Sequence, residues 1–241
     1  MTDTEQTGAA EVLIHLASRA AAHIRSKHHV NSAHQMIADT MIKRLECAGN
    51  HSAKLRRPSR RIVRGLRHAP TVFAQCCADN LSTLTGAALA AFGHVNWAEY
   101  YAEDDWSRPF LPDFANGEGI GPDGVLIHDE IILGLFVLGP DTVYPPHAHP
   151  AAEAYIVISG EAEFQVGADA RHSSKKPGDL ILHRENEPHA IRTHDKPLFA
   201  IYVWSGAISE RSWYSDDMAN PTAKVRYPTI KKGIAKLFPT D

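Results

Sequence analysis

The sequence has few cysteines and no long apolar run. Only three of its 241 residues are cysteine, and two of them, Cys76 and Cys77, are adjacent and cannot easily bond to each other. An odd cysteine count of this kind argues against a disulfide framework and is typical of a reducing compartment. No apolar stretch approaches the about 20 residues that a membrane-spanning helix requires. The residues after Met1, TDTEQTGAAE, lack the basic start and apolar core of a secretory signal, so we expect a cytoplasmic protein.

An excess of positive charge is also lacking. The formal net charge is −3, which gives no electrostatic reason to expect a nucleic acid or a membrane as a partner. The local exception is the basic run KLRRPSRRIVRGLR, Lys54 to Arg67, which could bind nucleic acid or an anionic ligand. This run contains no aromatic residue on which a base could stack. We favour the alternative that it is a solvated linker or helix face whose arginines pair with acidic residues elsewhere.

Apolar spacing divides the chain into two parts. From about Ala9 to Glu103, apolar residues recur at steps of three and four, which predicts helices, one of them from about Thr71 to Phe92. From Leu126 onward, short β-branched and aromatic runs alternate with turns, which predicts an antiparallel barrel or sandwich. Between the two parts, Asp113 to Gly124 is rich in Gly, Pro and Asp and is predicted to be a loop.

The predicted fold is therefore α+β, mainly β. A helical N-terminal segment, residues 1–105, is expected to pack on a small antiparallel β-barrel, residues 106–241. The length of the chain suffices for such a barrel with a helical appendage and a sizeable core. Because the helical segment is amphipathic, we expect it to cover the barrel or to build a subunit interface rather than to form an independent domain.

The most informative segment is PPHAHPAAEAYIVISG, residues 145–160. Side chains two residues apart on a strand share a face, so His147 and His149 project together. The PAA turn then lets Glu153 return to that face, and Tyr155 follows it two residues later. Two imidazoles and a carboxylate are suitable ligands for a divalent cation, and the phenol would stand close to its open coordination positions. The alternative is a polar loop with incidental histidines, in a chain that has 15 of them.

A second block, KPGDLILHRENEPHAI at residues 176–191, fits the first. Together the two blocks resemble the two motifs of the cupin superfamily. The first cupin motif is His-x-His, three residues, Glu, six residues, Gly, and it ends here at Gly160. The second opens with a Gly-Asp turn at Gly178 and ends eleven residues later at His189. The resemblance implies that His189 completes a metal site with His147, His149 and Glu153.

The second block departs from the cupin pattern at three positions. Arg184 and Asn186 stand where the family has Pro and Gly, and Thr193 stands where it has a trailing Asn. Asn tolerates the left-handed backbone conformation that Gly serves, so a turn at Asn186 remains plausible. His183 also lies in this block, and we predict that it faces away from His189 and stays outside the ligand set.

One branch of the cupins matches further. The pattern His-x-His-x-x-x-Glu-x-Tyr, followed after the last histidine by an aromatic-rich strand with Phe199, Tyr202 and Trp204, resembles the cupin-type dimethylsulfoniopropionate (DMSP) lyases of bacteria. The long N-terminal helical region is most similar to that of the DddL branch. The resemblance is strongest from Gly139 to Gly206.

This resemblance implies a carbon-sulfur lyase that converts DMSP to dimethyl sulfide and acrylate by base-initiated β-elimination. It implies one divalent transition metal ion, Zn, Fe, Mn or Ni, which binds the substrate carboxylate and acidifies the neighbouring C–H. Tyr155 would be the general base, and because its unperturbed pKa is about 10, it needs the nearby cation to become a phenolate. The family resemblance also suggests a homodimer and a small-molecule substrate.

Other aromatic residues are weaker candidates. Tyr144 is a second acid, base or substrate contact, or else a rim aromatic that packs on the barrel. Tyr202 and Trp204 share a strand face and could bind the sulfonium, because aromatic faces attract diffuse cations. The alternative for both is simple core packing. Three residues of the helical segment are further candidates for such a cage: Trp97, Tyr100 and Tyr101.

Two functions of other classes stay open. A metal-dependent dioxygenase or isomerase acting on another small organic acid could use the same four ligands, because three His and one Glu suit several metals. A non-catalytic ligand-sensing cupin is the other, with the basic run in a regulatory role. The complete ligand set and the lack of a helix-turn-helix signature weaken this second alternative.

Overall fold

The computed structural model describes residues 3–27, 31–49, 54–58, 62–78, 82–167, 172–214 and 226–228. Helices dominate the first part of the chain. The α-helices are α1 (Asp3–Arg25), α2 (Ser32–Cys47), α3 (Ala69–Ala78) and α4 (Thr83–Ala91). Three short 3₁₀ helices are η1 (Arg64–His68), η2 (Phe92–His94) and η3 (Leu111–Asp113).

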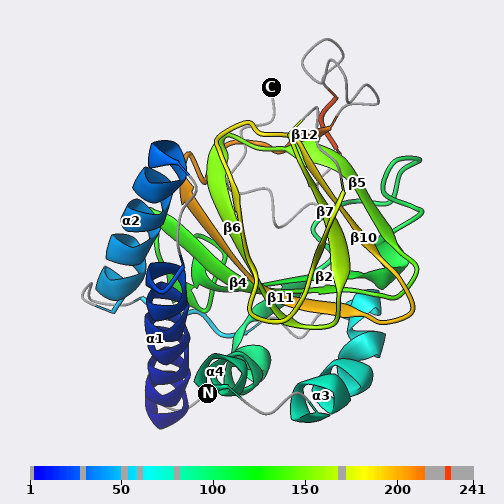
Figure 1. Cartoon of the computed structure of the whole chain (residues 1–241). Coiled ribbons are helices and arrows are strands. Elements are labelled where there is room, and N and C mark those ends of the chain that lie inside the picture. The colour runs from blue at the N-terminus through cyan, green and yellow to red at the C-terminus, as the bar shows by residue number, and fades with distance from the viewer. Residues whose placement is uncertain are drawn as a thin grey trace.

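The strands form two sheets that face each other (Figure 1). The larger sheet has the order β1 (Asn96–Ala98), β2 (Phe114–Gly121), β4 (Ile131–Leu138), β11 (Leu198–Gly206), β6 (Ala151–Ser159) and β9 (Leu180–His183), with β3 (Leu126–Ile127) paired to β2. The smaller sheet has the order β12 (Trp213–Tyr214), β5 (Val143–Ala148), β10 (His189–Thr193), β7 (Ala162–Val166) and β8 (Ser173–Lys175). All strand pairs are antiparallel except β2 with β3.

The predicted fold class is confirmed, with one difference in how the strands close. Among the described residues, no strand pairing joins the two sheets, so they form an open barrel rather than a closed one. The chain changes sheets at turns, for example between β9 and β10, where the backbone hydrogen bonds pass from one set of partners to the other. Side chains, rather than a continuous ladder, therefore hold the two sheets together.

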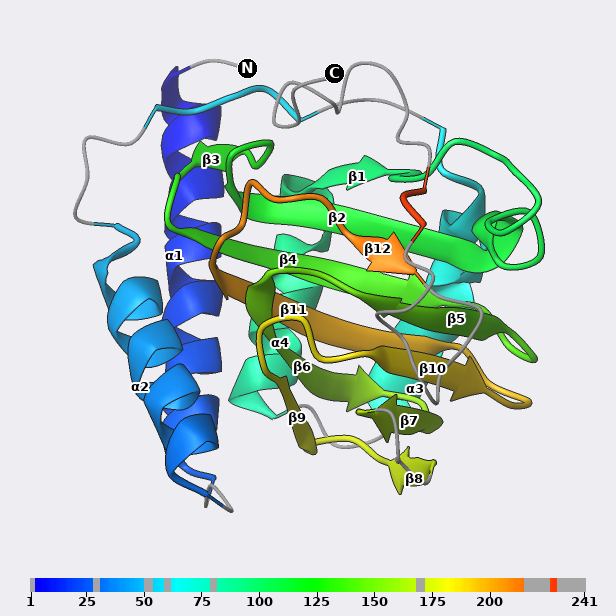
Figure 2. The ribbon, with the colours of Figure 1, turned by 90° about the horizontal axis from the view of Figure 1, so that it is seen from above.

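The larger sheet is buried on both faces. Every residue of β4 and β6 is buried, as expected for continuous apolar runs such as those of these two strands. The inner face contacts the smaller sheet through a cluster rich in aromatic side chains, including Phe114, Phe136 and Phe164. The outer face packs against the helices, with α1, α2 and α4 covering it (Figure 2). A second apolar cluster fills this outer layer and includes Leu13, Met41 and Leu133 from different elements.

Three details of the first part differ from the prediction. The region from Ala9 to Glu103 is not helical throughout, because β1 lies within it and pairs with β2. The helix predicted from Thr71 to Phe92 is two helices, α3 and α4. The loop predicted from Asp113 to Gly124 is mostly strand β2. Glycine is present here because neighbouring side chains leave no room for a larger residue, and not because the backbone turns. A Cβ at Gly117 would lie 2.6 Å from the side chain of Val95.

Three of the four described arginines of the basic run pair with acidic residues, as predicted. Arg64 lies 2.8 Å from Glu99, and Arg67 lies 2.5 Å from Asp113. Arg56 lies 3.2 Å from Asp123. These pairs tie the run to the edge of the larger sheet. Residues 59–61 of the run lie outside the described residues. No described helix is long and apolar enough to span a membrane.

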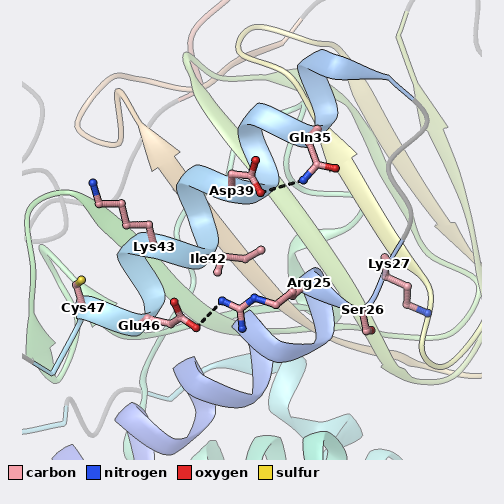
Figure 3. A pocket seen from close by; sticks show the side chains of 9 residues that line it. All are labelled: Arg25, Ser26, Lys27, Gln35, Asp39, Ile42, Lys43, Glu46 and Cys47. Atoms are coloured by element: carbon pink, nitrogen blue, oxygen red, sulfur yellow. Dashed lines mark hydrogen bonds and ion pairs between the residues drawn. The ribbon is translucent and has the colours of Figure 1, made fainter.

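A hollow of about 510 Å³ lies at the surface between the end of α1 and α2 (Figure 3). Its lining is polar and includes Arg25 and Glu46, which pair with each other at 2.5 Å, and Gln35, which donates to Asp39. One ion pair and one hydrogen bond thus form among the polar groups that line the hollow. It lies on the far side of the helical layer from the aromatic interior.

We predict that residues 1–105 and 106–241 do not fold as separate units. Separation would expose the outer face of the larger sheet, which the helices now cover, and this apolar area supplies much of the free energy of folding. Each piece, expressed alone, should show no cooperative thermal unfolding by circular dichroism. Cooperative unfolding of both pieces, together with full activity of the second, would contradict this expectation.

Candidate metal centre

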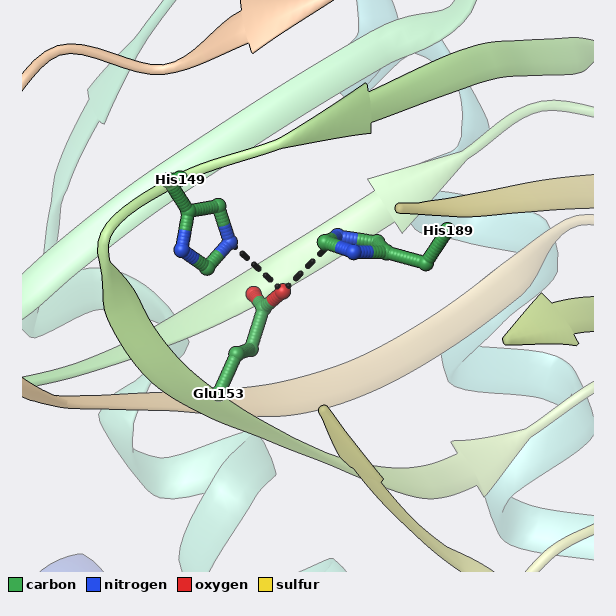
Figure 4. A group of neighbouring side chains, drawn as sticks. All are labelled: His149, Glu153 and His189. Carbon is green, nitrogen blue, oxygen red and sulfur yellow. Dashed lines mark hydrogen bonds and ion pairs between the residues drawn. The ribbon is translucent and has the colours of Figure 1, made fainter. Parts of the chain in front are cut away.

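Four side chains from three strands and one turn meet inside the barrel. His147 lies on β5, Glu153 on β6 and His189 at the start of β10, while His149 directly follows β5. Each is at most 3% exposed. One ligand atom from each of His149, Glu153 and His189 lies within 4.8 Å of the other two (Figure 4). His147 is the cross-strand partner of His189, with ring centroids 4.1 Å apart. The structure thus brings His149, Glu153 and His189 within reach of one ion, while His147 borders this group through its contact with His189 and lies outside it.

The three histidines share one hydrogen-bond arrangement. Nδ1–H of His147 donates to the carbonyl of Pro145, that of His149 to Ala151, and that of His189 to Glu187, each over 2.8 Å. Metal-binding histidines commonly donate their second ring nitrogen in this way, which sets the tautomer and the ring orientation. Nε2 is therefore the nitrogen left to act as a ligand in all three rings.

The free nitrogens face the carboxylate of Glu153. Nε2 of His149 and Nε2 of His189 each lie 3.1 Å from Oε2 of Glu153. When Nδ1 carries the proton, Nε2 of a neutral ring presents a lone pair. The lone pairs of the two histidines would then face the lone pairs of the Glu153 oxygen, which is unfavourable. Charging both rings would crowd cations inside a buried site beside His147. One cation shared by nitrogen and oxygen lone pairs resolves the conflict, so this buried group could hold a metal ion.

Electrostatics favour the ionised form of Glu153. Burial opposes the charge, but the neighbouring His149 and His189 rings outweigh it and hold the pKa of the carboxyl well below its ordinary value. Trp204 adds a further contact, since its indole N–H donates to Oε1 of Glu153 over 2.6 Å. The indole also stacks on the ring of His149, with centroids 3.9 Å apart. Trp204, expected as a wall for the sulfonium, thus supports two of the ligands directly.

Tyr155 stands next to the cluster, as its spacing predicted. It follows Glu153 by two residues on β6, and it is 4% exposed. Burial and then the charge of Glu153 raise the pKa of Tyr155 well above its ordinary value. The side chain alone is therefore a neutral phenol, and it needs a nearby cation to act as a base.

Tyr144 also borders the cluster. Its ring lies 4.0 Å from that of His147, and its hydroxyl is 2.6 Å from the hydroxyl of Tyr101. Burial raises the pKa of both phenols. Tyr101 comes from the segment before the barrel, so residues outside the two motif blocks reach the interior. Nothing in the sequence pattern singled out this hydroxyl pair.

The remaining aromatic candidates occupy different places. Tyr202 is the cross-strand partner of Tyr155, and its hydroxyl donates to Asn116 over 2.8 Å. Its ring passes over Gly134, where a Cβ would lie 2.3 Å away. Tyr100 packs edge-on against Tyr101 in the inner layer. Trp97 belongs instead to the outer cluster and donates its indole N–H to the carbonyl of Phe92.

The prediction that His183 faces away from His189 is wrong. The two rings stack with centroids 4.0 Å apart, and His183 is fully buried. His183 and His189 are six residues apart, and on one continuous strand an even spacing would place both side chains on the same face. The turn at Asn186 instead places them on strands of different sheets. His183 is also the cross-strand partner of Glu153.

Comparisons with known proteins show the family of the chain. The family model described as dimethylsulfoniopropionate lyase matches residues 33–200. The chain belongs to the DMSP lyase family. It is 32% identical to the DMSP lyase DddQ of Ruegeria pomeroyi over 127 residues, which are 52% of this chain and 62% of that protein. It is 30% identical to the putative DMSP lyase DddL of Cereibacter sphaeroides over 153 residues, 63% of this chain and 61% of that protein. Both matches thus span less than two thirds of the relative.

Solved structures support the fold. The crystal structure of DddQ from Ruegeria pomeroyi DSS-3 superposes with a TM-score of 0.55 and 26% identity, covering 67% of this chain and 81% of that one. A structure reported with the DMSP lyases RdDddP and RnDddQII superposes with a TM-score of 0.58 and covers 83% of this chain and 94% of that one. At 24% identity, this second likeness concerns the fold alone.

Two of the three departures of this DMSP lyase family member from the cupin pattern have local explanations. Asn186 adopts the left-handed conformation that the prediction required, with φ of 56°. Its backbone N–H donates to the carbonyl of His149, which links the second block to the first. Thr193 uses its hydroxyl to donate to the carbonyl of Gly139 over 2.5 Å and to accept from the N–H of Thr142. Both substitutions therefore keep a turn or a strand crossing in place.

We predict that single alanine substitutions of His147, His149, Glu153 or His189 remove most of the bound metal. Each change deletes a ligand atom from a buried group, and Glu153→Ala also leaves facing nitrogens without a counter-charge. Metal content should be measured by elemental analysis after purification in the presence of divalent ions. Tyr202→Phe, which removes only a hydroxyl outside the group, is the control and should keep its metal. Full occupancy in two or more of the alanine variants would rule out this ligand set.

Proposed function

We propose that the protein is a metal-dependent lyase that cleaves DMSP to dimethyl sulfide and acrylate. The observation that carries this proposal is Tyr155 beside Glu153, inside a buried cluster of three histidines, in a chain of the DMSP lyase family. The relatives named DMSP lyases support the substrate class. A good leaving group and a positioned base suffice for this chemistry, and the site offers a candidate for the base.

The reaction removes the proton next to the substrate carboxylate. The C–H electron pair becomes the new C=C bond, the C–S bond breaks, and its electrons leave with the sulfur as neutral dimethyl sulfide. The chemistry that a bound divalent ion supplies is Lewis-acid stabilisation of the charge that develops at the carboxylate. His147, His149, Glu153 and His189 would hold that ion.

The protein residues supply the base, the enclosure and the orientation. Tyr155 is the proposed base, because it follows Glu153 by two residues on β6 and lies close enough for the charge of that carboxylate to raise the pKa of its phenol. Tyr144, hydrogen-bonded to Tyr101, is the second candidate for handling a proton. The aromatic cluster between the sheets excludes water, which strengthens electrostatic interactions within the site. Tyr202 and the exposed part of Trp204 are proposed to attract the sulfonium.

We further propose a homodimer in the cytoplasm that uses Zn, Fe, Mn or Ni. The dimer rests on the family resemblance alone, and the cytoplasmic location rests on the cysteine usage. The histidine-rich donor set suits all four metals, and coordination geometry would select among them.

The decisive experiment is headspace detection of dimethyl sulfide after purified protein is mixed with DMSP. We expect release that a chelator abolishes and that one divalent metal restores. The same assay under anaerobic conditions separates a lyase from a dioxygenase, since only the dioxygenase consumes O₂. No dimethyl sulfide from metal-loaded protein would refute the proposed activity.

Tyr155→Phe should lower kcat by about 10² to 10⁴, the usual contribution of a positioned base. The change removes one oxygen and keeps the ring, so packing and metal content should survive. The loss should appear in kcat rather than mainly in KM, because the missing interaction acts in the transition state. Steady-state kinetics on metal-loaded variant and wild type measure it. If the variant keeps more than about a tenth of wild-type kcat, well short of the range expected for a base, the role passes to Tyr144.

A further inference from the structure

The site contains a fourth histidine that the metal ligands do not require. His183 ends β9, and it is the cross-strand partner of Glu153. Partners on adjacent antiparallel strands point to the same face of a sheet, so His183 points into the interior with Glu153. Its ring stacks on His189 at 4.0 Å, and it meets the ring of Tyr155 edge to face at 5.9 Å.

His183 differs from the three ligand histidines in its hydrogen bonds. Each ligand ring donates Nδ1–H to a backbone carbonyl. Both ring nitrogens of His183 are buried and have no hydrogen-bond partner among the described residues. Buried polar groups without a partner are rare in proteins and costly, so each such case calls for an explanation. Without a carbonyl to set its tautomer, His183 is also not prepared for metal binding as its neighbours are.

An incoming ligand can supply the missing partner. An imidazole carries at least one N–H in either protonation state, so His183 always has a hydrogen to donate. A carboxylate accepts hydrogen bonds at both oxygens, whereas a dimethylsulfonium group offers no acceptor oxygen or nitrogen. The donor beside Glu153 and Tyr155 therefore matches the carboxylate end of the substrate.

We propose that His183 binds the carboxylate of the substrate by donating a hydrogen bond to one of its oxygens. This inference rests on the proposed function and deepens it, because it assigns a specificity-determining contact within the same site. The contact would select small carboxylic acids over their amides or esters. Acrylate carries the same group and would make the same contact, whereas dimethyl sulfide would not.

The test compares His183→Leu and His183→Gln with wild type, each loaded with metal. Leu removes the donor at similar size, and Gln retains an N–H. His15→Leu, a change at an exposed position on α1, is the matched control. We expect His183→Leu to keep its metal and its melting temperature. The KM for DMSP and the inhibition constant of acrylate should rise by the same factor, about 10- to 100-fold for a hydrogen bond to a charged group. The Gln variant should recover part of the loss.

Three other results with these variants would each overturn the proposal. Loss of metal in His183→Leu would make His183 a ligand. A rise in KM for DMSP with unchanged acrylate inhibition would place it at the sulfonium end, and no change in either constant would remove it from the substrate. Calorimetric titration of acrylate into metal-loaded protein separates this inference from the lyase activity. If the protein releases no dimethyl sulfide but His183→Leu still weakens acrylate binding, the proposed contact stands and the proposed reaction is refuted. Wild-type protein that does not bind acrylate would refute the contact.

Discussion

The structure depends on one buried carboxylate. Glu153 lies in the interior, where the indole N–H of Trp204 donates to one of its oxygens and Nε2 of His149 and Nε2 of His189 face the other. Removing a partner from a buried charge typically costs roughly 3–5 kcal/mol. The two motif blocks are therefore coupled, since one supplies the carboxylate and the other supplies His189. The same carboxylate raises the pKa of Tyr155 beside it, so any cation bound at the centre acts on the ligand and the proposed base together.

The scaffold around this carboxylate makes its position rigid. Glu153 lies on β6, the penultimate strand of the larger sheet, between Trp204 on β11 and His183 on the edge strand β9. Helices cover the other face of that sheet, and two polar contacts tie them to it: Arg44 of α2 donates to Ser205, and a ring nitrogen of His23 lies 3.0 Å from the carbonyl of Gly178. Strand β6, which carries Glu153, is thus packed from both sides. The helical part contributes to the interior as well, because Tyr101 bonds to Tyr144.

The site has two kinds of histidine, and the distinction lies outside the side chains themselves. Backbone carbonyls at Pro145, Ala151 and Glu187 set the tautomer of the three ligand rings. His183 has no such carbonyl, although it stacks against His189. Ligand rings held in one orientation suit a permanent ion, whereas a ring with free nitrogens suits a molecule that enters and leaves. The local backbone therefore assigns different tasks to chemically identical groups.

By itself, the sequence predicted the fold class and the adjacency of Tyr155 to Glu153, and its family resemblance predicted the four metal ligands, three of which meet in one buried group. These follow from short-range rules, because alternation on a strand and the spacing of two motifs act over a few residues. Only the tertiary structure decided the partners across strands. The contact of Trp204 with Glu153, the pair of Tyr101 with Tyr144, and the stacking of His183 on His189 each join segments whose register no local pattern encodes. Gly117 and Gly119 contributed to the prediction of a loop, because composition cannot distinguish a flexible turn from a strand crowded by neighbouring side chains. Register and crowding arise only when the sheets and helices pack, so they belong to the fold rather than to any segment of the chain.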